Sequence, residues 1–260
     1  MVKISIIITT YNQEKYIAQA IESVLAQKDC PKYEIIIGND FSIDKTGQIV
    51  EEYQKKYPNI IRVLKRDKNL GMLCNLKDCF ENCSGEYIAI LEGDDYWIDP
   101  FKLKKQYYLL SKKDNALLCF NDVYLKYDND ESLKEHLKKI KKKLKNKITF
   151  EELVKYGNPI GNFSCCMYRK KALKYIPKSY WENKENADWL FNLYLLDISD
   201  GIYLNERCSV YRINSYGLWS SMSSQEKLYL VVKALNEYNR LFKYKYIKIF
   251  MKRLACIIKV

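Results

Sequence analysis

Four largely apolar runs, rich in β-branched residues, alternate with helical patterns in the first hundred residues of this chain. The runs cover Lys3–Thr10, Tyr33–Gly38, Ile60–Leu64 and Glu86–Leu91. Apolar runs of this length are typical of strands that are buried on both faces of a parallel sheet. Their alternation with helices predicts an α/β fold with a mostly parallel, doubly wound central sheet that is flanked by helices.

The segments between these runs have apolar residues at helical spacing. Ile17, Ile21, Val24 and Leu25 predict a first helix over about 13–27, with Asn12 as its N-cap. A second helix follows a turn at 41–47 and ends at Pro58, and a third covers 72–83.

Beyond Pro100 the alternation becomes looser. We expect helices over 101–111, 149–156 and 187–196, and from 223 to the end; the second begins with the capping box Thr149-x-x-Glu152. We expect extended segments over 115–127, 165–168 and 201–212, and a charged, Lys-rich insert over 128–147. This pattern divides the chain into a domain over 1–220, with halves 1–110 and 111–220, and a helical extension over 221–260.

Polar residues follow three of the predicted strands at their carboxyl ends. They are Thr9-Thr10-Tyr11-Asn12, Asn39-Asp40 and Asp94-Asp95. Ligands of doubly wound sheets bind beyond the carboxyl ends of the strands. We therefore expect the three groups to converge on one ligand-binding cleft.

Each of these residues also has a structural explanation. Asp94 and Asp95 favour Mg²⁺ or Mn²⁺, which binds carboxylate and phosphate oxygens together, but they would also suit a solvated turn. Asp40 would accept a hydrogen bond from a nucleoside or form an Asx-turn. Tyr11 would lie against a nucleobase or be a buried aromatic residue.

The composition favours an anionic partner. The formal net charge is +12, from 44 Lys and Arg against 32 Asp and Glu, and the segment KKIKKKLKNK at 138–147 contributes much of it. Nucleotide phosphates, nucleic acid and acidic lipids all suit such a charge, but a nucleic-acid role rests on charge alone and we do not expect one.

The cysteines and the apolar segments indicate the compartment. Nine cysteines have no disulfide-like spacing and His136 is the only histidine, so we expect free thiols and no Cys/His zinc site. The sequence has no signal-peptide pattern and no run of 18 apolar residues. We expect a cytoplasmic protein, with peripheral attachment to the inner face of the membrane as a hypothesis.

The chain resembles the family 2 glycosyltransferases, which have the GT-A fold. The matching segments are SIIITTYN at 5–12, EIIIGND at 34–40, NLG at 69–71 and GEYIAILEGDD at 85–95, followed by Tyr96-Trp97 and Asp99-Pro100. The resemblance is good over 3–110 and looser to about 220, where Asp188-Trp189 and Tyr211-Arg212 match later positions of the family.

The resemblance implies a role for each matching residue. Thr9, Tyr11 and Asp40 would line the nucleoside pocket, and Asn12 would join this nucleotide-sugar site. Asp94 would contact the ribose or the donor sugar, and Asp95 would coordinate Mn²⁺ or Mg²⁺. Asp188 would be the catalytic base, with Glu185 as second choice, and Arg212 would lie near the diphosphate.

Two positions depart from the family's pattern. Relatives often have Asp in place of Asn39, and many have His in place of Asn214. The second departure implies either a lower affinity for the metal or a mobile loop at this segment.

The resemblance further implies metal-dependent, inverting transfer of a hexosyl group from a nucleotide-sugar, with a UDP-sugar expected. The acceptor would be a saccharide or lipid-linked saccharide in bacterial polysaccharide or glycoconjugate synthesis. The acceptor pocket is expected within 150–220, where Asn162, Trp181 and Trp219 are available. Basic and aromatic residues such as those of Tyr244–Met251 suit a membrane surface, packing on the domain or a homodimer.

Two other functions compete with this interpretation. A degenerate relative would bind a nucleotide-sugar or a polyanion without catalysis, but Asp94, Asp95 and Asp188 are all present. A nucleotidyltransferase would need a Gly-rich, basic phosphate loop after the first strand, and 9–14 is neither.

Overall fold

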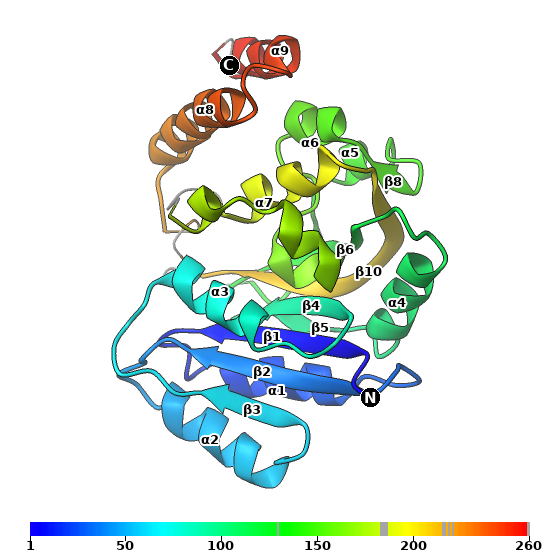
Figure 1. Ribbon diagram of the computed structural model, residues 1–260. Coiled ribbons are helices and arrows are strands. Elements are labelled where there is room, and N and C mark those ends of the chain that lie inside the picture. Colours follow the sequence, from blue (N-terminus) through cyan, green and yellow to red (C-terminus); the bar gives the residue numbers. More distant parts are fainter. Residues whose placement is uncertain (129, 183–186, 215–216, 218, 220, 259–260) are drawn as a thin grey trace.

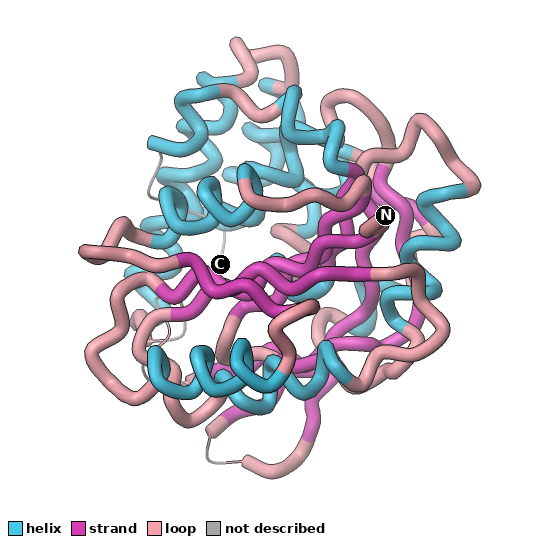
Figure 2. Tube along the Cα trace, turned by 60° about the horizontal axis from the view of Figure 1, so that its bottom comes forward, coloured by secondary structure: helices cyan, strands magenta, loops and turns pink. Residues whose placement is uncertain are grey.

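The chain folds around one mixed sheet that carries helices on both faces. The structure, a computed structural model, describes residues 1–128, 130–182, 187–214, 217, 219 and 221–258. In this part of the chain the sheet has ten strands, in the order β3-β2-β1-β4-β9-β6-β10-β5, with β7 paired to β6 and β8 paired to β10. Figure 2 shows helices on either side of the strands. The predicted α/β class is confirmed.

The bounds of the elements are as follows. The strands are β1 (Ile4–Thr10), β2 (Tyr33–Asn39), β3 (Ile61–Leu64), β4 (Tyr87–Glu92), β5 (Tyr96–Trp97), β6 (Leu118–Tyr127), β7 (Leu133–Glu135), β8 (Lys147–Ile148), β9 (Cys166–Arg169) and β10 (Gly201–Ile213). The helices are α1 (Ile17–Leu25), α2 (Thr46–Lys56), α3 (Met72–Glu81), α4 (Lys102–Ser111), α5 (Lys138–Lys141), α6 (Phe150–Tyr156), α7 (Ala187–Leu196), α8 (Ser224–Leu241) and α9 (Ile247–Ile258). Short 3-10 helices are η1 (Phe163–Cys165), η2 (Lys170–Tyr175) and η3 (Lys178–Glu182).

The strand β1 is buried on both faces, as its apolar sequence predicts. Ile6 and Ile8 pack in the core that includes α1, whereas Ile7 belongs to the core that includes α3. The strands β2 and β4 flank β1 in parallel, and β3 extends the sheet beyond β2. Their carboxyl ends therefore lie along one edge of the sheet (Figure 1).

The second half of the sheet mixes strand directions. The strand β9 is antiparallel to both β4 and β6, so β6 runs in the same direction as β4. The long strand β10 is parallel to β6 and brings its carboxyl-terminal half to the same edge. The capping box at the start of α6 is present, with Thr149 and Glu152 exchanging hydrogen bonds.

Two sequence predictions of elements need correction, and the structure adds detail to a third segment. The first helix begins at Ile17 rather than near Gln13, and Asn12 is not its N-cap; Asn12 has φ 52°, and its side chain accepts from Ile43 N at 2.9 Å. The C-terminal segment forms two helices because Lys243 and Tyr244 both have positive φ. The Lys-rich insert contains β7, α5 and the start of β8.

The last two helices lie at one end of the molecule (Figure 1). Phe150 of α6 packs against Phe242, Tyr246 and Phe250, so α9 is fixed to the rest of the chain by aromatic contacts. In the described ranges, each helix is too short or too polar to cross a bilayer. The division of the chain at residue 220 stays a prediction.

Candidate functional site

The polar groups that follow β1, β2 and β4 meet at one edge of the sheet, as expected. Asp40 N donates to Thr10 O at 2.9 Å, and Gly93 N donates to Thr9 O at 2.9 Å. A Cβ at Gly93 would lie 2.8 Å from Thr10 Cβ, a separation that side chains do not tolerate. Only glycine at this position lets the acidic turn after β4 pack against β1.

Asp95 is fully buried beneath this turn. Its Oδ2 accepts from Asn162 Nδ2 and from Ser164 Oγ, both at 2.6 Å, and its Oδ1 accepts from the backbone N–H of Arg212 at 2.9 Å. Burial, followed by repulsion from Asp94, raises the pKa of Asp95 to about 7. The hydrogen bonds only partly offset this desolvation.

Asp94 lies beside Arg212 and Asn214. Asn214 Nδ2 donates to Asp94 Oδ2 at 3.0 Å, and the guanidinium of Arg212 donates to the carbonyl oxygen of Asp94. The guanidinium carbon is 4.9 Å from the ring centroid of Tyr16 and 4.6 Å from that of Tyr96. Burial raises the pKa of Asp94. Asn214, at the position where many relatives have His, therefore contacts the acidic turn directly through its side-chain amide.

Sequence reasoning missed Glu92, the last residue of β4. Its Oε2 accepts from the same amide nitrogen of Asn162, at 2.6 Å, that serves Asp95. Burial and then Asp95, Asp94 and Asp188 raise the pKa of Glu92 well above its ordinary value. No alternation in the sequence indicates this role, because Glu92 ends a strand that is otherwise apolar and buried throughout.

Asp188 is the second residue of α7, as the sequence predicts, and it joins these acids. Asn158 Nδ2 donates to its Oδ2 at 2.7 Å. Burial raises the pKa of Asp188 to about 6, and the hydrogen bond from Asn158 opposes that rise. We call Glu92, Asp94, Asp95 and Asp188 the carboxylate cluster. Glu185, the second choice as base, lies outside the described residues.

Tyr211 lies within the electrostatic reach of the whole carboxylate cluster. Burial raises its pKa first, and Glu92, Asp95, Asp188 and Asp94 raise it further. It precedes Arg212 on β10, and its ring packs on the core that contains α7. Tyr211 therefore adds a neutral hydroxyl to a group of acids.

The cluster suits a divalent cation in charge and in donor type. An ionised carboxylate offers about four lone-pair sites, so the three donors at Asp95 leave about one. Within the described ranges, no three His, Cys, Asp or Glu side chains surround a common point as a complete metal site does. A cation here would need phosphate or water oxygens as further ligands, which is usual for Mg²⁺.

Asp40 holds the segment Asn69-Leu70-Gly71 in place. Its carboxylate accepts from Leu70 N at 2.7 Å and from Gly71 N at 2.9 Å, and Asn69 Nδ2 donates to its carbonyl oxygen at 3.1 Å. Gly71 has φ 82°, which a residue with a side chain rarely adopts. The structure thus joins two of the segments that carry the family resemblance.

The other predicted nucleoside residues lie on the same edge. Thr9 is at the end of β1, and the ring of Tyr11 is 47% exposed. Asn12 N donates to Ser42 Oγ at 2.9 Å, which ties the loop after β1 to the loop after β2. Asn39 Oδ1 accepts from Ser42 Oγ at 2.6 Å, so the amide oxygen has a hydrogen-bond partner within the loop after β2.

The three residues predicted for the acceptor pocket separate in the structure. Asn162 lies in the carboxylate cluster. Trp181 packs against Phe80 and Phe191, with ring centroids 6.0 and 6.5 Å apart, so it belongs to the core. Trp219 is partly buried.

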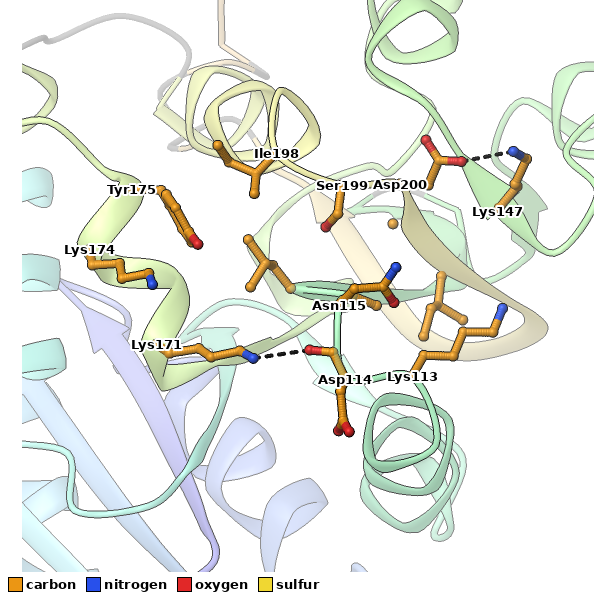
Figure 3. A pocket seen from close by; sticks show the side chains of 14 residues that line it. Lys113, Asp114, Asn115, Lys147, Lys171, Lys174, Tyr175, Ile198, Ser199 and Asp200 are labelled. Carbon is orange, nitrogen blue, oxygen red and sulfur yellow. Dashed lines mark hydrogen bonds and ion pairs between the residues drawn. The ribbon is translucent and has the colours of Figure 1, made fainter.

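A hollow of about 730 Å³ lies at the opposite edge of the sheet, where β6 and β10 begin (Figure 3). Lys113, Lys147, Lys171 and Lys174 line it, and none of the carboxylate cluster does. Lys147 pairs with Asp200 at 2.8 Å, and Lys171 Nζ donates to Asp114 O at 3.0 Å. This hollow is separate from the candidate site.

Comparison with known sequences identifies a family. The model of glycosyl transferase family 2 matches residues 5–176. An uncharacterized protein of Mycobacterium tuberculosis (strain ATCC 25618 / H37Rv) is 32% identical over 217 residues, which are 84% of this chain and 60% of that protein. An uncharacterized glycosyltransferase of Methanocaldococcus jannaschii is 30% identical over 237 residues, which are 87% of this chain and 76% of that protein. The chain thus spans about 60% of the length of the mycobacterial relative.

Solved structures agree on the fold. Residues 1–349 of S. aureus TarS, in complex with UDP-GlcNAc, match with a TM-score of 0.64 at 22% identity, over 90% of this chain and 66% of that one. The mannosyltransferase PcManGT from Pyrobaculum calidifontis, in complex with GDP-Man and Mn²⁺, matches with a TM-score of 0.65 at 13% identity, over 92% of this chain and 64% of that one. The predicted GT-A fold is confirmed.

Proposed function

Since the chain belongs to glycosyl transferase family 2, we propose that it transfers a sugar from a nucleotide diphosphate sugar to an acceptor hydroxyl. We propose a UDP-sugar as donor, a hexosyl group as cargo and inversion at the anomeric carbon. The solved complexes of two fold relatives, with UDP-GlcNAc and with GDP-Man, support a nucleotide-sugar donor whose base is uracil or guanine.

The carboxylate cluster carries this proposal. It combines Asp188, whose pKa is raised to about 6, with two acids that follow directly on a buried strand. A general base works best when its pKa lies close to the operating pH, because it is then both ionised and basic. Asp188 would take the proton of the acceptor hydroxyl as the oxygen attacks the anomeric carbon.

Asp95 and Asp94 would hold a divalent cation, Mn²⁺ or Mg²⁺, together with the diphosphate. When bound, such an ion stabilises the negative charge that develops on the leaving nucleoside diphosphate. The raised pKa of Asp95 supports this role, because a buried carboxylate beside another one gains most from a cation. Arg212, which contacts the same turn, would lie near the diphosphate.

The nucleoside would lie at the ends of β1 and β2. Tyr11 offers an exposed ring for the base, and Thr9 and Asn12 offer polar groups beside it. Asp40 would contact the uracil or the ribose with the lone pairs that the 69–71 segment leaves open. Its hydrogen bonds to that segment support a second task, which is to shape the pocket.

We propose a saccharide or lipid-linked saccharide as acceptor, in the assembly of a bacterial surface polysaccharide or glycoconjugate. The 1–110 half would bind the donor, the 111–220 half would bind the acceptor, and 221–260 would be an appended helical unit. We propose a cytoplasmic location with peripheral contact to the membrane, and a homodimer as the alternative use of the C-terminal helices.

Calorimetric titration with UDP-, GDP- and dTDP-sugars, with and without Mn²⁺, tests the proposal. We expect metal-dependent binding of one nucleotide class to the wild type and its loss in Asp95→Ala. Asp114→Ala is the matched control, because its side chain is 96% exposed at the opposite edge of the sheet. Binding without turnover on any acceptor would favour a degenerate nucleotide-sugar-binding module, and no binding at all would refute the donor site.

A further inference from the structure

The helix α9 has apolar residues on two faces. Phe250 and Leu254 are buried against the rest of the chain. Ile247 and Met251 are 44% and 53% exposed, and Ala255, one turn further, is also exposed. Tyr244, just before the helix, is 55% exposed. Residues at i, i+4 and i+8 lie on one side of a helix, so Ile247, Met251 and Ala255 form a second apolar row, which we call the α9 stripe.

The charges beside the α9 stripe have one sign. Residues 243–258 contain four lysines and one arginine and no Asp or Glu. Lys248 and Lys252 each follow a residue of the stripe and are exposed. Lys245 is paired with Asp197, but in the described ranges Lys248 and Lys252 have no carboxylate at ion-pair distance. An apolar row bordered by lysines is the pattern of helices that lie in a membrane interface.

The orientation of α9 is set by its other face. Tyr246 OH donates to Asp197 Oδ1 at 2.6 Å, and Arg253 Nη1 donates to Lys155 O at 3.3 Å. The rings of Phe150 and Tyr246 stack with centroids 3.8 Å apart. The α9 stripe is therefore exposed on the side of the helix away from these contacts. The helix itself lies at the end of the molecule remote from α2 (Figure 1).

We propose that the α9 stripe docks on an anionic lipid bilayer, with Tyr244, Ile247 and Met251 in the interface and Lys248 and Lys252 at the headgroups. Charge complementarity selects this partner. A second copy of the same face would place uncompensated lysines opposite each other, which is unfavourable. Acidic lipid headgroups instead attract each lysine near the surface.

The docked orientation brings the membrane to the Asp188 side of the candidate site. Arg253 of α9 contacts Lys155 in α6. The C-cap of α6, Gly157, is next to Asn158, whose amide donates to Asp188. A lipid-linked acceptor would then reach the proposed base from the membrane to which α9 is attached. This consequence, unlike the docking itself, rests on the proposed function.

Sedimentation with vesicles tests the docking. The full chain is mixed with phosphatidylglycerol–phosphatidylcholine vesicles or with pure phosphatidylcholine vesicles at low salt. We expect binding to the anionic vesicles, at least tenfold weaker binding for Ile247→Glu/Met251→Glu, and no such loss for Ile98→Glu/Tyr108→Glu. Ile98 and Tyr108 are 39% and 59% exposed but lie near α4, away from α9.

Charge reversal tests the lysines. Lys248→Glu/Lys252→Glu should weaken binding to anionic vesicles by a similar factor, whereas Lys55→Glu/Lys56→Glu, at the end of α2, should not. Equal losses in both pairs would indicate attraction by net charge alone and would overturn the docking face.

Three further results decide the matter. Wild-type protein that stays in solution at low salt, or an unchanged affinity of Ile247→Glu/Met251→Glu, would overturn the proposal. A change of molecular mass in that variant without lipid would show that the face binds another protein copy. Circular dichroism verifies that the variants fold, and calorimetric titration with the nucleotide-sugar, which should be unaffected, separates this result from failure of the proposed function.

Discussion

The backbone N–H of Arg212 donates to Asp95 Oδ1 at 2.9 Å, and this bond joins β10 to the acidic turn after β4. The same residue directs its guanidinium to the carbonyl oxygen of Asp94. One residue of the second half of the sheet thus holds both adjacent acids of the first half. A shift of β10 would therefore move the proposed metal ligands.

The pH dependence of turnover follows from the environment of Asp188. Because the base must be ionised, and burial raises its pKa to about 6, we expect kcat/KM to fall as the pH drops through 6. Asp188→Asn should lower kcat by about 10²–10⁴-fold, the usual contribution of a general base, and should leave nucleotide-sugar affinity unchanged. Full turnover of this variant in a sugar-transfer assay would remove Asp188 from the mechanism.

Asn158→Ala should move this acidic limb to higher pH. The amide of Asn158 donates to Asp188 and lowers its pKa, so its removal favours the protonated form. The measurement is the pH profile of kcat/KM for wild type and variant. Asn236→Ala, on the exposed surface of α8, is the control, and a profile that does not move in Asn158→Ala would contradict the assignment.

The stability of the fold should show the cost of keeping Asp188 ionised. Its folded-state pKa lies above the ordinary value, so its favourable contribution is present at low pH and is lost as the pH rises through about 6. The free energy of unfolding of Asp188→Asn, relative to that of the wild type, should therefore rise by up to about 2–3 kcal/mol when the pH is raised from 4 to 8. Urea unfolding at both pH values measures the difference, which should be small at the lower pH.

Asp40→Ala should release the segment 69–71. Two backbone N–H groups lose a charged acceptor, which costs about 2–3 kcal/mol of unfolding free energy, and nucleotide affinity should fall with it. Asp67→Ala, an exposed acid nearby, is the control and should change stability by less than about 0.5 kcal/mol. Thermal unfolding and calorimetry together reveal whether both effects occur.

The Lys-rich insert should be held mainly by a buried ion pair, the only one that it forms among the residues that the structure describes. Lys141 Nζ contacts Asp122 Oδ1, and the two side chains are 3% and 8% exposed. Lys141→Met leaves the buried carboxylate of Asp122 with less positive charge beside it, and should lower the free energy of unfolding by about 3 kcal/mol. The same substitution at the exposed neighbour, Lys142→Met, should lower it by almost nothing. Chemical denaturation measures both. Equal effects would show that the pair does not anchor the insert.

Most of the fold of the 1–110 half was predictable from the sequence. The strands β1, β2 and β4 are nearly continuous apolar runs, and such runs require burial on two faces whatever surrounds them. The positions of Asp40, Asp94 and Asp95 at strand ends follow from those runs, so their convergence followed as well. The start of α1 was not predictable in this way. The backbone N–H groups of Gln13 and Glu14 donate to Thr46 Oγ1, at the start of α2, and to Asp44 Oδ2, in the loop before it.

The hydrogen-bond partners of the site residues, and which residues belong to the site, were decided by the tertiary structure. Asn162, Ser164 and Arg212 are 67 to 117 positions from Asp95, and no local pattern indicates that they donate hydrogen bonds to its carboxylate. The inclusion of Glu92 and Tyr211 in the site has the same origin.

The sequence by itself determined the strand–helix order and the acids at the strand ends, because hydrophobic periodicity acts over a few residues. Only the tertiary structure decided the antiparallel insertion of β9, the partners of Asp95 and the exposed row of α9. Those features depend on contacts between distant segments, which set burial and hence pKa, orientation and exposure.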